Sequence, residues 1–219
     1  MPDTPVVAVR GEATRDVEPD LAVITASVSA RSADRQRTLR LLTERLDALR
    51  ALVDTYGPAV ERRESGGVSV RPETSGKSAE RVKGYLGLAT TRVWVGDFTA
   101  LGDIVVALSD LELTTVNGPV WLLRPENPAY REVRHEALRD AVDRARDYAR
   151  AVGAELVELV ELADAGLSGR SEPSPMAFAV SAQTYRGAAP ELNLDPELQR
   201  VYASVEARFT MTRPDVAAL

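Results

Sequence analysis

Hydrophobic residues follow two different periods along this chain, and the order in which the periods alternate restricts the fold. A two-residue period, typical of half-buried strands, is clearest in residues 6–16, 21–31, 82–95 and 201–209. A three- to four-residue period, typical of amphipathic helices, runs through residues 33–56, 98–109 and 128–152. Shorter apolar runs near residues 59–71, 114–122 and 155–164 add three strands, which gives the order β-β-α-β-β-α-β-α-β-loop-β. This order predicts an α+β fold, in which an antiparallel β-sheet carries helices on one face.

The first and third predicted helices have the most regular apolar faces. In the first, the seam consists of Leu39, Leu42, Leu46, Leu49 and Val53. Ser32 or Asp34 is suited to cap its start, and Gly57-Pro58 ends it. In the third, the face consists of Tyr130, Val133, Ala137, Ala141, Ala145, Tyr148 and Val152. The small alanines allow this helix to approach a neighbouring element closely, and Gly153 is its expected C-cap.

Residues 166–199 lack a steady period and are rich in Gly, Ser, Pro and Ala. We predict one domain over residues 1–219 with a long loop in this segment. The apolar stretch around Pro175, Met176 and Phe178 leaves two alternatives open: it docks on a partner or second subunit, or it folds back onto its own core.

Composition excludes several classes of site. The chain of 219 residues has no cysteine, so disulfides, thiolate metal sites and cysteine nucleophiles are excluded. Its net charge of −6 repels nucleic acid and anionic lipid overall, although a local basic patch is compatible with it. Aromatic residues make up 5 %, so base-stacking surfaces are scarce. The first residues resemble no secretory signal, and no run of residues is apolar enough for a membrane span. We therefore expect a soluble, cytoplasmic protein with no nucleic-acid partner and no transmembrane segment.

No motif for catalysis or for a cofactor is complete. The sole histidine, His135, lies in a His-Glu-Ala-Leu-Arg sequence, where a zinc-protease helix requires a second histidine at position 139. Ser168 lies in Gly-Leu-Ser-Gly-Arg, where a nucleophile elbow requires glycine at position 170. Phosphate-binding glycine loops and calcium loops are absent from the sequence. We therefore predict no catalytic residue, no metal site and no cofactor.

The segment Glu18-Pro19-Asp20 lies between the first two predicted strands and contains two carboxylates. Proline fixes φ near −65° and aspartate can bond to nearby backbone donors, which favours a tight connection between strands. A pair of working carboxylates, as in a hydrolase, is the less favoured alternative.

Four stretches together resemble the SIMPL-domain family. They are Gly11 with Glu18-Pro19-Asp20, residues 83–108 with Gly84-Tyr85, Asp97 and Gly102, the Ala-rich helix that ends at Gly153, and the last strand, Leu198–Met211. The family includes bacterial periplasmic and outer-membrane-associated immunogenic proteins and an animal protein that binds a kinase of interleukin-receptor signalling. The resemblance implies a mixed α/β fold, self-assembly, and roles tied to the cell envelope or stress. It implies no catalytic residues, and it marks Gly11, Pro19, Asp20, Gly84, Tyr85 and Gly153 as a fold signature.

Three functional hypotheses follow. The first is a non-enzymatic protein that acts by self-assembly, as a homo-oligomer, or by binding a protein partner. The second is a small-ligand binding module with an apolar pocket between sheet and helices, near Tyr85, Trp94 or Trp121. The third is a hydrolase that uses Glu18 and Asp20.

Overall fold

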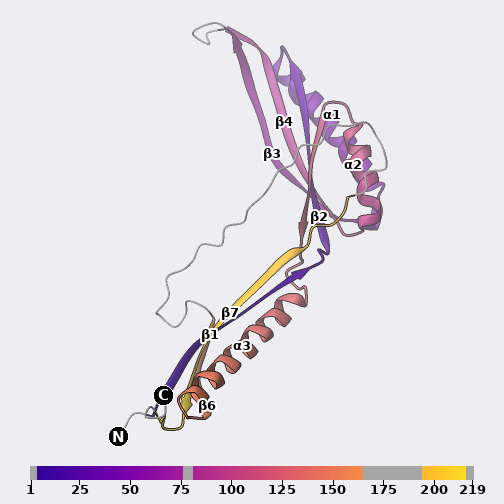
Figure 1. The fold of residues 1–219 in the computed structure, drawn as a ribbon. Helices are drawn as coiled ribbons and strands as arrows, with labels where there is room; N and C mark the ends of the chain where they lie inside the picture. Colours follow the sequence, from indigo (N-terminus) through magenta and orange to yellow (C-terminus); the bar gives the residue numbers. More distant parts are fainter. Residues whose placement is uncertain (1–3, 76–80, 165–193, 216–219) are drawn as a thin grey trace. The chain divides into compact units, whose positions relative to one another are not determined.

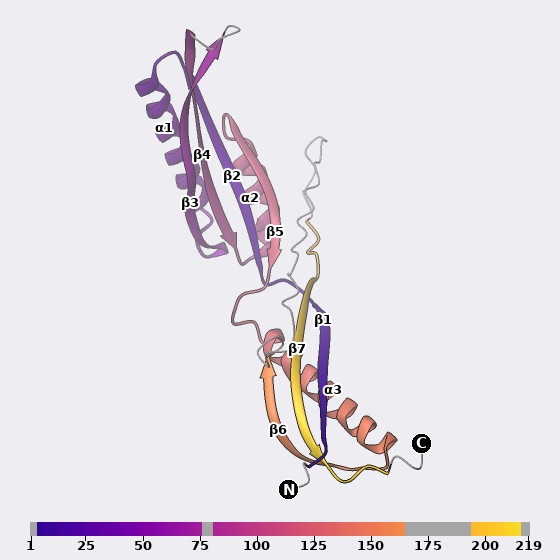
Figure 2. The same ribbon diagram turned by 90° about the vertical axis from the view of Figure 1, so that its left-hand side faces the viewer.

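A computed structural model of the chain describes residues 4–75, 81–164 and 194–215, which form two compact units. Unit 1 comprises Met1–Val17, Pro125–Val180 and Leu198–Leu219, and unit 2 comprises Glu18–Arg124 and Ser181–Glu197. Each unit is an antiparallel sheet with helices on one face, so the predicted α+β class is confirmed (Figures 1 and 2). The predicted contact residues Pro175, Met176 and Phe178 lie outside the described residues.

Unit 2 is built on a four-stranded sheet with the strand order β3-β4-β2-β5. Its strands are β2 (Leu21–Ser32), β3 (Val60–Ser75), β4 (Arg81–Val95) and β5 (Thr114–Leu122). The predicted hairpin is β3 and β4, whose register shifts near Gly66-Gly67. β2 and β4 are the two inner strands: β2 pairs with β4 and β5, and β4 pairs with β2 and β3.

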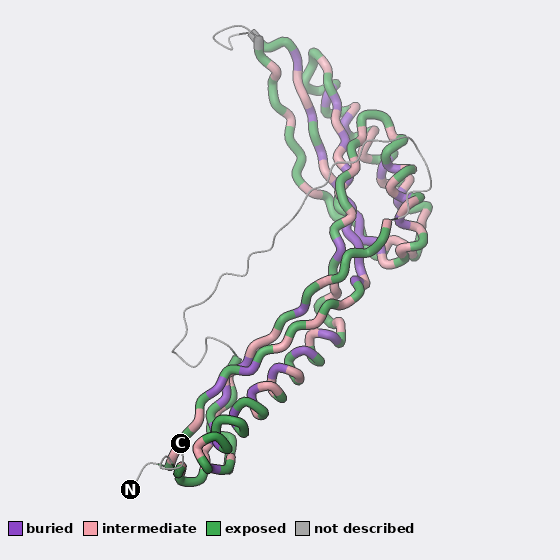
Figure 3. The backbone as a smooth tube through the Cα atoms, in the orientation of Figure 1, coloured by how far each residue is buried: buried purple, intermediate pink, exposed green. Residues whose placement is uncertain are grey.

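Two helices cover one face of this sheet and close the core of unit 2. They are α1 (Arg35–Asp54) and α2 (Leu101–Ser109), and the short 3₁₀ helices η1 (Gly57–Ala59) and η2 (Phe98–Ala100) precede β3 and α2. Alternate residues of β2, such as Ile24 and Val28, are fully buried against Leu42 and Leu49 of α1 and Ile104 of α2. In Figure 3 the buried residues follow β2, β4 and the inner sides of the helices, whereas β3 is exposed along most of its length.

Unit 1 is a three-stranded sheet with the order β1-β7-β6, covered by one helix. Its elements are β1 (Val6–Val17), α3 (Ala129–Ala151), β6 (Leu156–Asp164) and β7 (Gln199–Met211). β1 pairs with β7 without interruption, from Val6 opposite Thr210 to Val17 opposite Gln199. The buried alanines of α3, including Ala137, Ala141 and Ala145, pack on Val9, Val205, Ala207 and Phe209.

The structure corrects three details of the sequence analysis. Leu39 was expected in the buried seam of α1 but is 42 % exposed. The buried face of the helix includes the preceding residue, Thr38, instead. Tyr148 was expected on the buried face of α3 but is 59 % exposed, and Ala149 is buried in its place. The predicted loop extends to residue 199, whereas β7 already begins there. In the described ranges, no helix combines the length and the hydrophobicity that crossing a membrane requires.

Candidate functional site

The segment Glu18-Pro19-Asp20 joins β1 and β2, which belong to different sheets, and its Asp20 contacts the chain just after β5. An Asp20 carboxylate oxygen accepts a hydrogen bond from the backbone N–H of Arg124, at 2.8 Å. In return, the Arg124 guanidinium donates to the Asp20 carbonyl oxygen at 2.5 Å. The same guanidinium pairs with Glu61 of β3. Asp20 therefore links the start of β2 to Arg124, two residues beyond the end of β5, and this contact lies within unit 2.

The two carboxylates of this segment differ in their surroundings. Asp20 is partly buried and engaged with Arg124, whereas Glu18 is exposed and Pro19 between them is buried. General acid–base catalysis by a carboxyl pair requires both groups to face one reacting position. The structure gives Asp20 a structural contact. Sequence reasoning missed its partner Arg124, and also Glu61, which pairs with the same arginine, because both are distant in sequence.

Gly11 lies where α3 crosses β1 at very short range. A Cβ atom at this position would lie 2.5 Å from the Ala141 backbone nitrogen and 2.7 Å from the Ala141 Cβ, and closer still to the Ala137 carbonyl oxygen. Beside it, the backbone N–H of Glu12 donates to the Asp140 carboxylate at 2.9 Å. This hydrogen bond, with a further contribution from Arg144, lowers the pKa of Asp140. The absence of a side chain at Gly11 thus lets α3 supply an acceptor to the outer edge of β1.

The remaining fold-signature residues lie beside or directly after the end of an element: Gly84 and Tyr85 of β4 lie beside the end of β2, and Gly153 follows α3. A Cβ at Gly84 would lie 2.9 Å from the Ser32 carbonyl oxygen, where β2 leads into α1. Next to it, the Tyr85 carbonyl accepts from the Thr38 hydroxyl of α1, at 3.4 Å. Gly153 has a φ of +67°. The N–H groups of Gly153 and Ala154 bond back to Arg150 and Ala149, which is the Schellman arrangement that ends a helix.

The face of the unit 1 sheet opposite α3 is a ladder of paired polar side chains. Arg10 pairs with Glu206 at 2.9 Å, and Arg200 pairs with Asp16 at 3.1 Å. The Tyr202 hydroxyl donates to Glu12 at 3.1 Å. Arg208 pairs with Glu161 of β6 at 3.3 Å, which carries the ladder across the third strand. In each of these pairs, the charged or hydroxyl group of one strand bonds to a group on the neighbouring strand, and this face stays well solvated.

The strand β6 differs from the rest of unit 1 because it exposes aliphatic side chains. Val157, Leu159, Val160 and Leu162 are 65 %, 46 %, 57 % and 49 % exposed. Its register against β7 shifts after Leu156 and again after Leu159, so Val157 and Val160 are the extra residues of two bulges. In the sequence, this strand shows a three-residue repeat of two aliphatic residues and one acid. Such a repeat does not match the two-residue period of a strand that is buried on one face.

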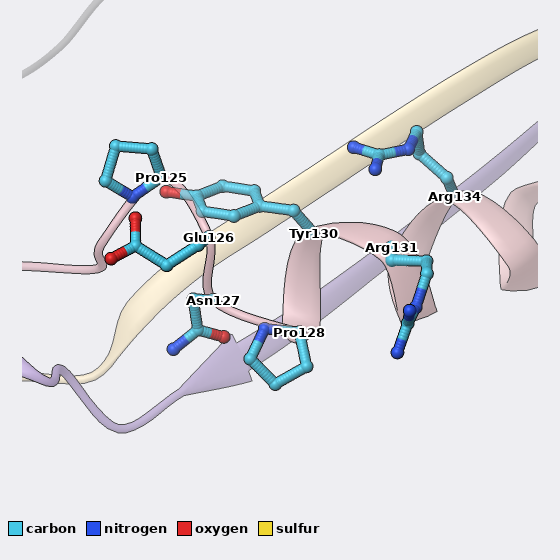
Figure 4. A pocket seen from close by; sticks show the side chains of 7 residues that line it. All are labelled: Pro125, Glu126, Asn127, Pro128, Tyr130, Arg131 and Arg134. Atoms are coloured by element: carbon cyan, nitrogen blue, oxygen red, sulfur yellow. The ribbon is translucent and has the colours of Figure 1, made fainter.

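An open hollow of about 450 Å³ lies at the start of α3, within unit 1. Figure 4 shows Tyr130 beside Pro125 and Glu126, with Arg131 and Arg134 pointing to different sides of the helix. Because the two cations diverge, the hollow has no convergent set of groups for a ligand. His135 is exposed on the same helix. Within the described ranges, no three His, Asp or Glu residues are grouped so that they could hold a metal ion.

The aromatic residues around which an apolar pocket was hypothesised do not converge. Trp121 is paired with Ala22 on the helix side of the sheet and packs edge-on against Phe98, with ring centroids 4.9 Å apart. Trp94 is opposite the next residue, Val23, and so lies on the other face. There the Arg62 guanidinium covers it at 4.3 Å from the ring centroid. Tyr85 pairs with Ser32 at the far end of β2.

Comparison with known proteins gives a family and distant structural likenesses. No curated protein matches the chain. Among solved structures, it is similar to a Burkholderia cenocepacia protein described as an amidohydrolase/peptidase, with 17 % sequence identity and a TM-score of 0.29. That alignment covers 68 % of this chain and 36 % of the other, and at this TM-score it carries no argument about activity. The family model SIMPL, described as a protein of unknown function (DUF541), matches residues 7–209, which include parts of both units. The chain therefore belongs to the SIMPL family.

Proposed function

We propose that this chain is a non-catalytic protein that acts by self-association, and that β6 is the strand through which two copies join. The observation that carries the proposal is the exposed aliphatic row on β6. Four of the eight large hydrophobic side chains that are exposed in the described part of unit 1 lie on this strand of nine residues. Exposed apolar rows on an edge strand favour pairing with another strand, because both the side chains and the edge backbone gain partners.

The other edge of the same sheet supports β6 as the joining strand. At β1, Asp140 of α3 accepts the Glu12 N–H, and Arg15 pairs with Glu132 and Glu136 of α3. These contacts occupy the β1 edge. β6 is the terminal strand on the opposite side of the described sheet.

The charges of β6 are compatible with a second copy in one register. The strand carries Glu158, Glu161 and Asp164 and no basic residue. Antiparallel pairing centred on Val160 places Glu158 opposite Leu162 of the second copy and Glu161 opposite its Leu159. No acid of one copy is then level with an acid of the other, which avoids direct like-charge repulsion. Such a two-fold contact uses the same surface on both copies and closes at a dimer.

The experiment is light scattering on a sizing column over a concentration series of the full chain. Wild type is expected to move from the monomer mass of 23.7 kDa towards twice that value. The double variant Val160→Lys/Leu162→Lys places charge on the exposed row and should remain monomeric. The matched control is Val68→Lys, which charges a valine that is 60 % exposed on the edge strand of unit 2.

Two results would contradict the proposal. A wild-type chain that stays monomeric at every concentration would remove self-association altogether. An assembly that survives the β6 substitutions, while circular dichroism shows an intact fold, would assign the contact to another surface.

A further inference from the structure

One end of unit 2 concentrates exposed cations on a chain whose net charge is −6. We call this surface the basic end, and its cations are Arg31, Arg35, Arg37, Arg40, Arg71 and Lys83, all of them exposed. Strand pairing brings them together, because Arg31 of β2 and Arg71 of β3 are both opposite Leu86 of β4. Figure 2 shows the start of α1 at the same end of unit 2 as the far end of the β3–β4 hairpin.

Few carboxylates neutralise these cations. Arg31 pairs with Glu73 at 2.5 Å, and Asp34 caps α1 by accepting the Arg37 backbone N–H at 2.7 Å. Within the described ranges, no ion pair is found for the side chains of Arg35, Arg37, Arg40, Arg71 and Lys83. The basic end therefore keeps a surplus of positive charge, whereas many other arginines of the chain, such as Arg144 with Asp140, are paired.

The placement of two of these arginines opposes the stability of their own helix. The N-terminus of a helix carries a partial positive charge, so acids stabilise the first turn and cations destabilise it. The first turn of α1 contains Arg35 and Arg37 and no acidic residue. The Asp34 cap supplies one negative charge at this end of the helix, but two cations occupy the turn that follows. A local rule that is broken in this way points to a role outside the fold.

Aliphatic side chains are exposed beside the cations. Leu39 of α1 is 42 % exposed, and Val82 and Leu88 of β4 are 48 % and 43 % exposed. Leu39 lies one turn of α1 after Arg35 and directly before Arg40, so cations lie beside its apolar atoms. Basic groups around exposed aliphatic residues are the combination that binds the interface of an anionic membrane.

We propose that the basic end docks onto the anionic surface of a lipid bilayer. The cations lie on both sides of the sheet, with Arg31 and Arg71 on the open face and Arg35 and Arg37 on the helix side, so a flat anionic surface placed across this end of unit 2 can contact both groups. Nucleic acid is less well matched, because binding of single strands uses exposed aromatic rings, and the aromatic residue at this end, Tyr85, is only partly exposed.

The test measures co-sedimentation of the full chain with phosphatidylcholine vesicles that contain phosphatidylglycerol, and with pure phosphatidylcholine vesicles. Wild type should bind the anionic vesicles, bind the neutral ones much more weakly, and dissociate as salt is raised. Each cation near such a surface strengthens binding about fivefold. The variant Arg35→Glu/Arg37→Glu should therefore lose binding by about 25-fold or more. It should unfold at the same or a higher urea concentration than wild type, because acids suit this helix turn.

The matched control is Arg131→Glu/Arg134→Glu on α3, which changes the net charge by the same amount at two exposed positions. This control should keep most of the vesicle binding. Equal losses in both variants would mean that net charge, and not the basic end, governs binding. Absence of wild-type binding to anionic vesicles, or tighter binding to a DNA duplex than to vesicles at the same salt concentration, would overturn the proposal.

Discussion

Substituting Gly11 by alanine tests the closest contact in unit 1. The added Cβ would lie 2.5 Å from the Ala141 nitrogen and 2.7 Å from its Cβ, distances that real Cβ contacts essentially never show. The atoms that it meets include the backbone of α3 at Ala137 and Ala141, which cannot rotate away as the end of a flexible side chain could. The helix must therefore move away from β1.

The expected loss of stability follows from three contributions. Forcing extra volume into a packed interface costs about 1–3 kcal/mol. Moving α3 outward also lengthens the 2.9 Å bond from the Glu12 N–H to Asp140, and a hydrogen bond to a charged group contributes about 1.5–3 kcal/mol at most. Alanine restricts the unfolded chain more than glycine does, which offsets up to about 1 kcal/mol. We expect the free energy of unfolding to fall by about 2–3 kcal/mol, a large part of the total for a domain of ordinary stability.

Urea denaturation followed by far-UV circular dichroism measures this change. The control is Gly67→Ala, because no atom lies within 4 Å of a Cβ at that position, and its effect should stay within about 0.5 kcal/mol of wild type. A Gly11→Ala protein that unfolds at the wild-type midpoint with an unchanged slope would refute the close approach of α3 to β1.

Three further substitutions test single polar contacts. Thr91→Val should raise the free energy of unfolding by about 1 kcal/mol in urea denaturation, because the Thr91 hydroxyl is buried without a hydrogen-bond partner. Asp20→Ala should lower it by about 1–2 kcal/mol, because the Arg124 N–H loses its acceptor; tryptophan emission is a suitable probe, since both tryptophans lie in unit 2. The hydrogen bond from the Glu12 N–H is the main reason why the pKa of Asp140 is lowered in the folded chain. The ionised Asp140 carboxylate therefore stabilises the fold above the unfolded pKa of about 3.9, and this stabilisation is lost as pH falls through the folded pKa. Asp140→Asn should therefore destabilise the chain at neutral pH, and thermal unfolding should show this difference shrinking below about pH 4; a difference independent of pH would contradict the assignment.

Local signals in the sequence predicted the individual elements well. The order of strands and helices is confirmed, and α3 runs from Ala129 to Ala151, within a residue of the predicted bounds. Asp34 caps α1 as one of the two predicted candidates, and Gly153 adopts the positive φ expected after α3. These features depend on residues a few positions apart, and so a single sequence is sufficient to reveal them.

Pairing between strands was not predictable in the same way. β1 and β2 are consecutive and joined by three residues, yet they belong to different sheets. The partner of β1 is β7, whose Glu206 is 196 residues from Arg10. A two-residue period shows that a strand has a buried face, but not which strand lies beside it. For the same reason the sequence analysis expected one sheet, and it missed the contact of Asp20 with Arg124.

The β6 surface and the basic end share one physical property: neither is arranged to stabilise the fold of the single chain. Many polar side chains of this chain accept a hydrogen bond from a nearby backbone N–H. Asp97 caps η2 by accepting from Thr99, and Asp140 accepts an N–H at the edge of β1. β6 and the start of α1 do the opposite, since one exposes aliphatic atoms to water and the other places cations at the positive end of a helix. Neither arrangement lowers the free energy of the folded chain, whereas each would lower it once a second copy or an anionic surface is present. Because β6 belongs to unit 1 and the basic end to unit 2, substitutions can remove one surface and leave the other in place.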